Sequence, residues 1–575
     1  MITRPTILRP SSWLADLSAV ALLAALLYGI VRVGKHWHAP LQPQVDIDLS
    51  PWALPGYTLL SLLRGVTAYL VSLALALAYG YAAAHRPRAE RMLMPLLDVL
   101  QSIPVLGFLP GAVLVLVALF PRTNAGLELA SILMIVTSQV WNLAFSVYQS
   151  LRSIPPELQE ASRVYQFNWW QRFRRVELPA AAVGLAWNSM MAMAGGWFFL
   201  MVCESFTLGS HDFRLPGLGA YMSAASARRD LPAICAGLAA MVIMIVVVDW
   251  CVWRPLLIWV QKFRMEETAA GVRRDTLLLR WLRHSWLAQA AMATVAHPLS
   301  EWLATAAHSG QSPAFKEPPA GGGGLRRLMV QLAGRGAAAV IAVFIMLAAV
   351  RMIRLLGQLS LAEWSDVLVG SLLTCLRVAA AVVLGSLWVI PVGIWIGRSE
   401  AWRSRLQPLV QVAASFPAPM LYPVILLALH AMGLGLGIGA VFFMLIGTQW
   451  YILFNVLAGA SAVPTDLREA ANAYRFTPVQ RWRVLWWPAV FPYLITGWVT
   501  AAGGAWNASI VAEYVAVGPH VSVTHGLGSL ISVAASRGRY DLLSAGVLTM
   551  AILVVLINRC LWKPLYRLAQ TRFAL

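Results

Sequence analysis

Charged residues are scarce in this chain, and acidic ones especially so. Asp, Glu, Lys and Arg make up 12% of the 575 residues, with 25 acidic side chains against 44 basic ones. Soluble globular domains carry about 25% charged residues, so the composition excludes an ordinary soluble protein. Hydrophobic residues instead reach 59%, an excess that a lipid bilayer can solvate. The composition therefore predicts an integral membrane protein.

Cysteine is rare as well, and clusters of metal ligands are absent from the sequence pattern. The five cysteines lie within or beside apolar segments and include no Cys-x-x-Cys pair: Cys203, Cys235, Cys251, Cys375 and Cys560. We expect buried thiols and neither a disulfide framework nor a metal site. The run "GIVRVGK" at 29–35 has the spacing of a phosphate-binding loop, but His36 follows where Ser or Thr is required. We therefore expect no cofactor and no catalytic cluster in this chain, which is not predicted to be an enzyme.

The net charge of +19 would suggest a nucleic-acid partner in a soluble protein. Here the basic residues fall in short loops beside apolar runs, and in membrane proteins Lys and Arg mark the cytoplasmic side. Loops at 86–91, 152–175, 398–405 and 468–483 are rich in arginine. With these loops inside, both termini are cytoplasmic. We expect a lipid bilayer around the chain and no nucleic acid.

Twelve apolar segments are long enough to cross about 30 Å of hydrocarbon as helices. The first half has 13–33, 57–84, 94–120, 128–150, 179–205 and 233–260; the second has 335–355, 367–397, 405–430, 436–458, 488–514 and 541–563. The prediction is an all-α polytopic membrane protein with about twelve transmembrane helices. Residues 1–260 and 335–575 form two six-helix units, and 261–334, which closes on "KEPPAGGGG", is a cytoplasmic linker.

The two halves repeat one sequence pattern. Residues 155–255 match 464–564 at an offset of 309, with pairs such as Pro155/Pro464, Trp197/Trp506 and Glu204/Glu513, and "GLG" at 217–219 returns at 526–528. Each half has an even number of predicted spans, so both insert in the same orientation. We expect two parallel repeats that pack about an axis along the membrane normal.

A short polar helix interrupts each half between its fourth and fifth spans. The runs are "ELQEASRVYQF" at 157–167 and "DLREAANAYRF" at 466–476, each after a proline that can begin a helix. One apolar face at i, i+3 and i+7 holds Leu158, Ala161 and Tyr165 in the first copy and Leu467, Ala470 and Tyr474 in the second. Glu160 and Glu469 lie near the first turns, where the helix dipole favours anions. These helices, near 156–170 and 465–479, are suited to dock into a groove on a soluble partner.

The longer runs "ELQEASRVYQFNWWQRFRRVELP" and "DLREAANAYRFTPVQRWRVLWWP" each resemble the Glu-Ala-Ala loop of permease subunits of bacterial ABC importers. The Tyr-x-Phe pattern and the later Gly-Gly-x-Trp…Glu pattern resemble the sequences of permeases in the nitrate, sulfonate, taurine and bicarbonate group, in duplicated form. That family has Gly six residues after the Glu, where Gln166 and Arg475 stand here. Ser162 replaces the second Ala of the first copy.

The resemblance implies a function and partners. It implies the transmembrane permease of an importer in the bacterial inner membrane, for a small anionic solute delivered by an extracytoplasmic binding protein. Two copies of a cytoplasmic ABC ATPase would hold ATP and Mg²⁺. The coupling helices would carry Leu158, Glu160, Ala161, Tyr165, Leu467, Glu469, Ala470 and Tyr474. The alternative is a secondary transporter with two parallel six-helix repeats, which would need titratable groups within the membrane for ion coupling.

Other residues at the predicted membrane boundary are candidates for the transport pathway. Glu204 and Glu513, with Trp197 and Trp506, are candidates for a gate, because acids at membrane depth are costly. The alternative is an interfacial acid that accepts hydrogen bonds from the next loop. Arg64 and Arg377 either draw anions to the entrance or extend to the membrane surface. The outer loops at 206–232 and 515–540 are expected to form short helices that receive the binding protein.

Overall fold

The computed structural model describes residues 45–102, 105–208, 211–263, 349–517 and 520–572, with a few single positions outside these ranges. The chain divides into two compact units. One comprises Met1–Val31, Ser146–Asn188 and Trp250–Gln358; the other comprises Arg32–Phe145, Ser189–Asp249 and Leu359–Leu575. The predicted span 13–33, most of the predicted span 335–355 and almost all of the predicted linker 261–334 lie outside the described residues.

The first half is helical apart from one hairpin. Its elements are α2 (Leu54–His85), α3 (Pro87–Ser102), η1 (Val105–Phe108), α4 (Leu109–Leu119), α5 (Ala125–Arg152), α6 (Pro156–Val164), α7 (Trp169–Arg172), η2 (Phe173–Glu177), α8 (Leu178–Cys203), β1 (Ser205–Leu208), β2 (His211–Arg214), α9 (Leu218–Arg228), α10 (Leu231–Val248), η3 (Asp249–Trp253), α11 (Arg254–Val260) and η4 (Gln261–Phe263).

The second half repeats this order. Its elements are α16 (Leu361–Gly397), α17 (Glu400–Ser415), η6 (Ala418–Leu421), α18 (Tyr422–Ala431), α19 (Leu436–Ser461), α20 (Thr465–Ala473), α21 (Pro478–Arg481), η7 (Trp482–Trp486), α22 (Trp487–Ala512), β3 (Tyr514–Val517), β4 (His520–Val523), α23 (Leu527–Ser536), α24 (Tyr540–Ile557), η8 (Asn558–Trp562) and α25 (Lys563–Arg572). The internal repeat found in the sequence is therefore also a repeat of structure.

Eight helices of the described residues are long and apolar enough to span a membrane, or nine if one bent pair counts as a span. Two of the predicted spans are broken rather than continuous. The segment 94–120 is divided among α3, η1 and α4. The segment 405–430 is bent by 78° between α17 and α18, at Phe416-Pro417, where Phe416 is extended with ψ 126°. Proline disfavours a helical residue before it, which explains the break.

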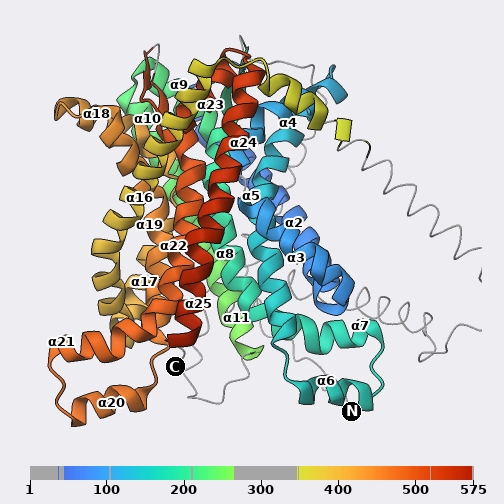
Figure 1. Cartoon of the computed structure of the whole chain (residues 1–575), viewed down its shortest axis with the longest axis vertical. Coiled ribbons are helices and arrows are strands. Elements are labelled where there is room, and N and C mark those ends of the chain that lie inside the picture. Colours follow the sequence, from blue (N-terminus) through green and yellow to red (C-terminus); the bar gives the residue numbers. More distant parts are fainter. Residues whose placement is uncertain are drawn as a thin grey trace, which may run out of the picture. The chain divides into compact units, whose positions relative to one another are not determined.

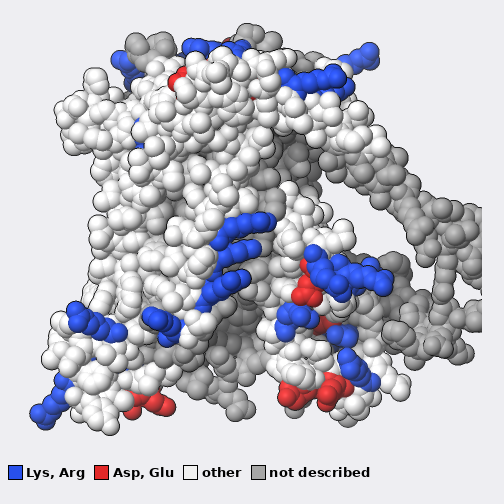
Figure 2. Space-filling view, in the orientation of Figure 1, with Lys and Arg blue, Asp and Glu red and all other residues white. Residues whose placement is uncertain are grey.

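The unit that contains α16 to α25 is held together by close helix packing. Gly393 and Gly397 of α16 lie against Val456 and Ala460 of α19, so closely that an added Cβ would come within 2.6 Å of either neighbour. Small residues at helix crossings let backbones approach in this way. Figure 1 shows α19 beside α22, with α9 and α23 at one end of this unit and α20 and α21 at the other. Figure 2 shows charged side chains over both ends and a largely uncharged flank over α16 and α19.

The predicted outer loops each begin with a β-hairpin that no sequence pattern indicated. In the first, Ser205 pairs with Arg214 and Leu208 with His211; in the second, Tyr514 pairs with Val523 and Val517 with His520. The expected short helices then follow as α9 and α23. Strands of four residues are too short for an alternating pattern to stand out in the sequence.

Four π-helical turns also occur at equivalent places in the two halves. η2 precedes α8 as η7 precedes α22, and η3 follows α10 as η8 follows α24. Such turns hold one residue more than an α-helical turn and are frequent at functional sites. Each half therefore contains two π-helical turns, one just before its fifth predicted span and one near the end of its sixth.

Candidate functional site

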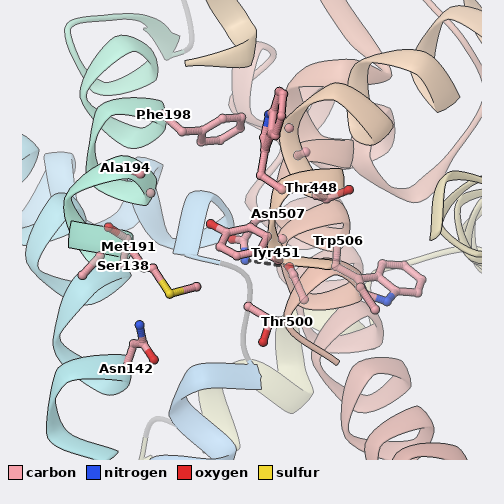
Figure 3. A pocket seen from close by; sticks show the side chains of 18 of the residues that line it. Ser138, Asn142, Met191, Ala194, Phe198, Thr448, Tyr451, Thr500, Trp506 and Asn507 are labelled. Carbon is pink, nitrogen blue, oxygen red and sulfur yellow. Dashed lines mark hydrogen bonds between the residues drawn. The ribbon is translucent and has the colours of Figure 1, made fainter. Parts of the chain in front are cut away.

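A cavity of about 320 Å³ lies between helices of the two repeats. It is formed by residues of one compact unit, chiefly from α5, α8, α19 and α22. Figure 3 shows Met191, Ala194 and Phe198 on one side, with Tyr451, Thr500 and Asn507 facing them. Glycines 195, 503 and 504 also line it, and an added Cβ at Gly503 would meet nothing within 4 Å. The cavity is thus open beside Gly503, whereas a Cβ at Gly504 would come within 3.1 Å of Thr448.

The side chains that line this cavity are uncharged throughout the described residues: Asp, Glu, Lys, Arg and His do not occur among them. Aromatic rings are frequent, including Trp141, Phe198, Trp450, Tyr451 and Trp562. Polar groups are sparse and neutral. The cavity can therefore accept apolar surface and form a few directed hydrogen bonds, but it offers no countercharge.

A buried ion-pair cluster joins α2, α5 and the end of α8 in the first repeat. Arg64 donates to both oxygens of Glu128, at 2.7 and 2.8 Å, and pairs with Glu204 as well. The Ser61 hydroxyl donates to Glu204 at 2.6 Å. Arg64 and Glu204 are 5% and 0% exposed. Their charges are thus compensated inside the protein and not presented to solvent.

The same carboxylate also holds the start of α9. The N–H of Gly219 donates to Glu204 at 2.7 Å, where the helix dipole favours an anion. An added Cβ at Gly217 would overlap the carboxylate, and one at Gly219 would lie 2.6 Å from the Met201 carbonyl oxygen. The Gly-Leu-Gly motif therefore lets the backbone approach the buried acid.

The second repeat has the corresponding cluster with one carboxylate fewer. Glu513 is fully buried and accepts hydrogen bonds from Arg377 at 2.8 Å, from Thr374 at 2.8 Å and from the N–H of Gly528 at 2.9 Å. Gly437 stands 309 positions after Glu128, and Arg377 bonds the Thr524 hydroxyl at 3.1 Å. The two clusters are alike in geometry but differ in charge.

Glu204 and Glu513 are both 0% exposed, and each is paired with an arginine of its own repeat. Buried ion pairs of this kind pay a desolvation cost close to their Coulombic gain. Their effect is to fix the position of α9 and α23 more than to add net stability.

The first of the two predicted polar helices is α6. Glu160 and Tyr165 are exposed, with Tyr165 74% exposed, and Leu158 is 38% exposed. Ala161 is half-buried, whereas Ser162 is buried. The helix ends in a tight turn in which Phe167 N–H bonds the Ser162 carbonyl at 3.0 Å, and Gln166 has φ 50°. This left-handed residue occupies the position where the family pattern has glycine.

The second polar helix, α20, has the same form. Leu467, Glu469, Ala470 and Tyr474 are exposed, with Tyr474 78% exposed. Ala471 is buried against Val463, Leu485 and Ala489. The terminal turn is again left-handed, with φ 51° at Arg475. Both copies therefore bury the third residue of the Glu-Ala-Ala pattern, Ser162 or Ala471, and expose the tyrosine.

The two helices differ in how they are anchored. In the first, Arg172 pairs with the buried Glu177 at 2.7 Å. In the second, Trp486 stands at the equivalent place, and Arg468 lies over its ring at 5.5 Å. This difference in anchoring involves residues other than the exposed tyrosines.

The predicted pathway residues separate into two groups. Trp506 lines the cavity, although its ring in Figure 3 points away from the wall that carries Phe198. Trp197 is packed against Gly65, and neither it nor Glu204 and Glu513 is among the described residues that line the cavity. The gate therefore stays a prediction for the two acids, whose contacts match the alternative of an acid bound to the next loop.

The two arginines are not free cations at an entrance. Arg64 is compensated by two carboxylates and Arg377 by one, so the geometry does not favour their predicted role in drawing anions. Sequence reasoning missed Glu128, the second partner of Arg64, and the polar cavity residues Asn142, Gln411, Tyr451 and Thr500. Two of these, Asn142 and Tyr451, stand at equivalent positions of the repeat, next to a shared tryptophan.

These features define a helical membrane transport protein built from two fused repeats, with a cavity between helices of both repeats and two exposed polar helices. The chain belongs to the family of binding-protein-dependent transport system inner membrane components, whose pattern matches residues 72–253 and again 389–561. It is therefore an ABC transporter permease in duplicated form.

Curated relatives have several solutes in their names. An aliphatic sulfonates transport permease protein of Bacillus subtilis is 26% identical over 198 residues, 33% of this chain and 69% of the relative. The taurine transport system permease protein of Escherichia coli is 27% identical over 186 residues, 32% and 62% respectively. The bicarbonate transport system permease protein of Synechocystis is 30% identical over 142 residues, 25% and 49% respectively. In the last two, the match spans less than two thirds of the relative.

Proposed function

We propose that this chain is the membrane-spanning subunit of an ATP-driven importer in a bacterial inner membrane, with both termini in the cytoplasm. ATP hydrolysis takes place in a separate ABC ATPase, of which two copies dock on α6 and α20. An extracytoplasmic binding protein delivers a small solute with an anionic group, and the solute passes through the cavity between the repeats. ATP-driven approach of the two ATPase subunits then changes the access of the cavity from one side to the other.

The observation that carries this proposal is the pair of exposed helices with one shared form. In each, a glutamate and a tyrosine are exposed, while the residue after the central alanine is buried. Exposed apolar and aromatic groups beside charged ones are typical of surfaces that bind a partner. A secondary transporter has no use for two such surfaces. It would also need titratable groups near its solute, and the described cavity residues include no acid, histidine or lysine.

The test is charge reversal on both helices. Glu160→Lys and Glu469→Lys together are expected to lower co-purification of the partner ABC ATPase, because each reverses an exposed charge. Asp46→Lys is a control, since Asp46 is exposed and lies outside α6 and α20. Insertion of the chain in the membrane should be unchanged in both variants. Full retention of the ATPase by the double variant would contradict the proposal.

A further inference from the structure

The two repeats line the cavity with different side chains at equivalent positions. At the offset of 309 that relates Gly195 to Gly504 (504 minus 195), Met191 corresponds to Thr500 and Phe198 to Asn507. All four line the cavity. A permease built from two identical subunits would present the same side chains on both sides of its axis. Fusion of the repeats has allowed α8 and α22 to diverge at the positions that face the solute path.

The wall formed by α8 is entirely apolar. Its cavity residues are Met191, Ala192, Ala194, Gly195, Phe198 and Phe199. In Figure 3, the Phe198 ring and the Met191 thioether extend from this wall into the space between the repeats. Such a surface binds apolar groups by burying them from water. It provides nothing to replace the hydration shell of a small inorganic ion.

Polar side chains reach the cavity from both repeats: Thr137, Ser138 and Asn142 of α5 belong to the first, and Gln411, Tyr451 and Thr500 belong to the second. The Gln411 side chain lines the cavity, and its Oε1 is buried without a hydrogen-bond partner among the described residues. Gln411 is 5% exposed. A buried acceptor of this kind costs free energy unless something donates to it. Thr500 and Tyr451, on α22 and α19, add hydroxyl groups to the same cavity.

We infer that the cavity binds an amphipathic organic solute, with an apolar body against α8 and a polar end toward Gln411, in a single orientation. The inference rests on the proposed function as an importer and specifies the solute class for it. A hydrogen-bond donor on the solute satisfies Gln411. An inorganic oxyanion such as nitrate is excluded as the preferred solute, because it has no apolar body and the lining holds no cation.

The test compares probes of different chemistry on the purified chain in lipid nanodiscs. The probes are benzenesulfonamide, benzenesulfonate and nitrate, and calorimetry measures their binding. Both aromatic probes are expected to bind at least tenfold more tightly than nitrate. Nitrate binding as tight as benzenesulfonate, or no binding by either aromatic probe, would overturn the inference.

A variant that makes the walls alike isolates the role of α8. Met191→Thr with Phe198→Asn copies the residues of the second repeat onto the first, and is expected to weaken benzenesulfonate binding about tenfold. Each single variant should weaken benzenesulfonate binding about threefold. The single variants keep the inference testable if the double variant does not fold. The matched control is Met432→Thr, at a residue that is 63% exposed and outside the cavity lining; it should bind normally. Unchanged binding by the single and double variants would refute the inference.

ATPase co-purification from the same preparations separates the two proposals. If the α8 variants weaken binding of the aromatic probes but no ATPase co-purifies, the importer proposal fails and the inferred amphipathic site stands. If the ATPase co-purifies but the α8 variants bind the probes normally, the importer proposal stands and the solute inference fails.

Discussion

Val105 and Asn507 lie 402 positions apart in the sequence and are joined by a hydrogen bond, in which the Val105 N–H donates to Asn507 Oδ1 at 2.7 Å. Val105 begins η1 of the first repeat, and Asn507 belongs to α22 of the second. Both residues line the cavity. The Asn507 amide also donates to the Gly503 carbonyl at 3.2 Å. One side chain thus joins the two repeats at the wall of the cavity.

The first prediction removes this link. Asn507→Ala leaves the Val105 N–H without its partner, which costs about 1–3 kcal/mol of unfolding free energy. Thermal unfolding of the chain in detergent should show the loss, and solute uptake in proteoliposomes should fall with it. Asn455→Ala is the control, because Asn455 bonds only the Tyr451 carbonyl of its own helix among the described contacts. Equal stability of the two variants would argue against a link between the repeats.

The second prediction concerns the buried pair of Arg377 and Glu513. Glu513→Ala leaves the partly buried Arg377 without its carboxylate and frees the start of α23, so the unfolding free energy should fall by about 3–5 kcal/mol. Replacing both partners, with Arg377→Met and Glu513→Leu, should restore much of that loss, because no charge remains buried. Denaturant unfolding monitored by tryptophan fluorescence measures both. A double variant weaker than Glu513→Ala would show that the hydrogen bonds to α23 dominate.

The third prediction fills the cavity. Gly503→Leu places a side chain where an added Cβ meets nothing within 4 Å, so solute uptake should drop at least tenfold while stability changes by less than about 1 kcal/mol. Gly111→Leu is a matched control, since it also has open space around it but does not line the cavity. Uptake by reconstituted vesicles distinguishes the two. Normal uptake by Gly503→Leu would mean that the solute passes elsewhere.

The fourth prediction separates docking from turn geometry in α6 and α20. Tyr165→Ala and Tyr474→Ala should each reduce solute-stimulated ATP hydrolysis by the reconstituted complex, because truncating an interface anchor costs on the order of 2 kcal/mol. Gln166→Gly and Arg475→Gly should leave hydrolysis near normal. They should stabilise the terminal turn by about 1 kcal/mol, because the left-handed conformation is costly for residues other than glycine.

The tyrosines and the left-handed residues are adjacent, so each pair of variants is a control for the other. Greater damage from the glycine substitutions than from the tyrosine truncations would place coupling in the divergent positions. Circular dichroism would establish that both retain helix content.

The sequence was informative where a pattern is local. Hydrophobic run length predicted the spans around α2, α5, α8, α10, α16, α19, α22 and α24, and the i, i+3, i+7 pattern predicted α6 and α20. The duplication paired Glu204 with Glu513 and the two Gly-Leu-Gly motifs. It could not reveal that each motif encloses its own glutamate, because that depends on close backbone approach between residues distant in the chain.

The cavity lay beyond sequence reasoning for a related reason. Met191, Gln411, Tyr451 and Thr500 look like ordinary residues of apolar helices, and only the rotation of each helix decides which side chains face inward. Glu128 was missed because it lies in the first turn of α5, where an acid is expected for helix capping. The hairpins β1–β2 and β3–β4 were missed because four residues are too few to set a period.

The π-helical turns carry a consequence for the history of the chain. η2 and η7 each hold five residues, Phe173–Glu177 and Trp482–Trp486, and they coincide at the same offset as η3 and η8. A π turn holds one residue more than an α-helical turn, so the match between the repeats extends from sequence to a local departure from α-helical geometry. Duplication of one repeat that already held both turns accounts for all four of them among the described residues.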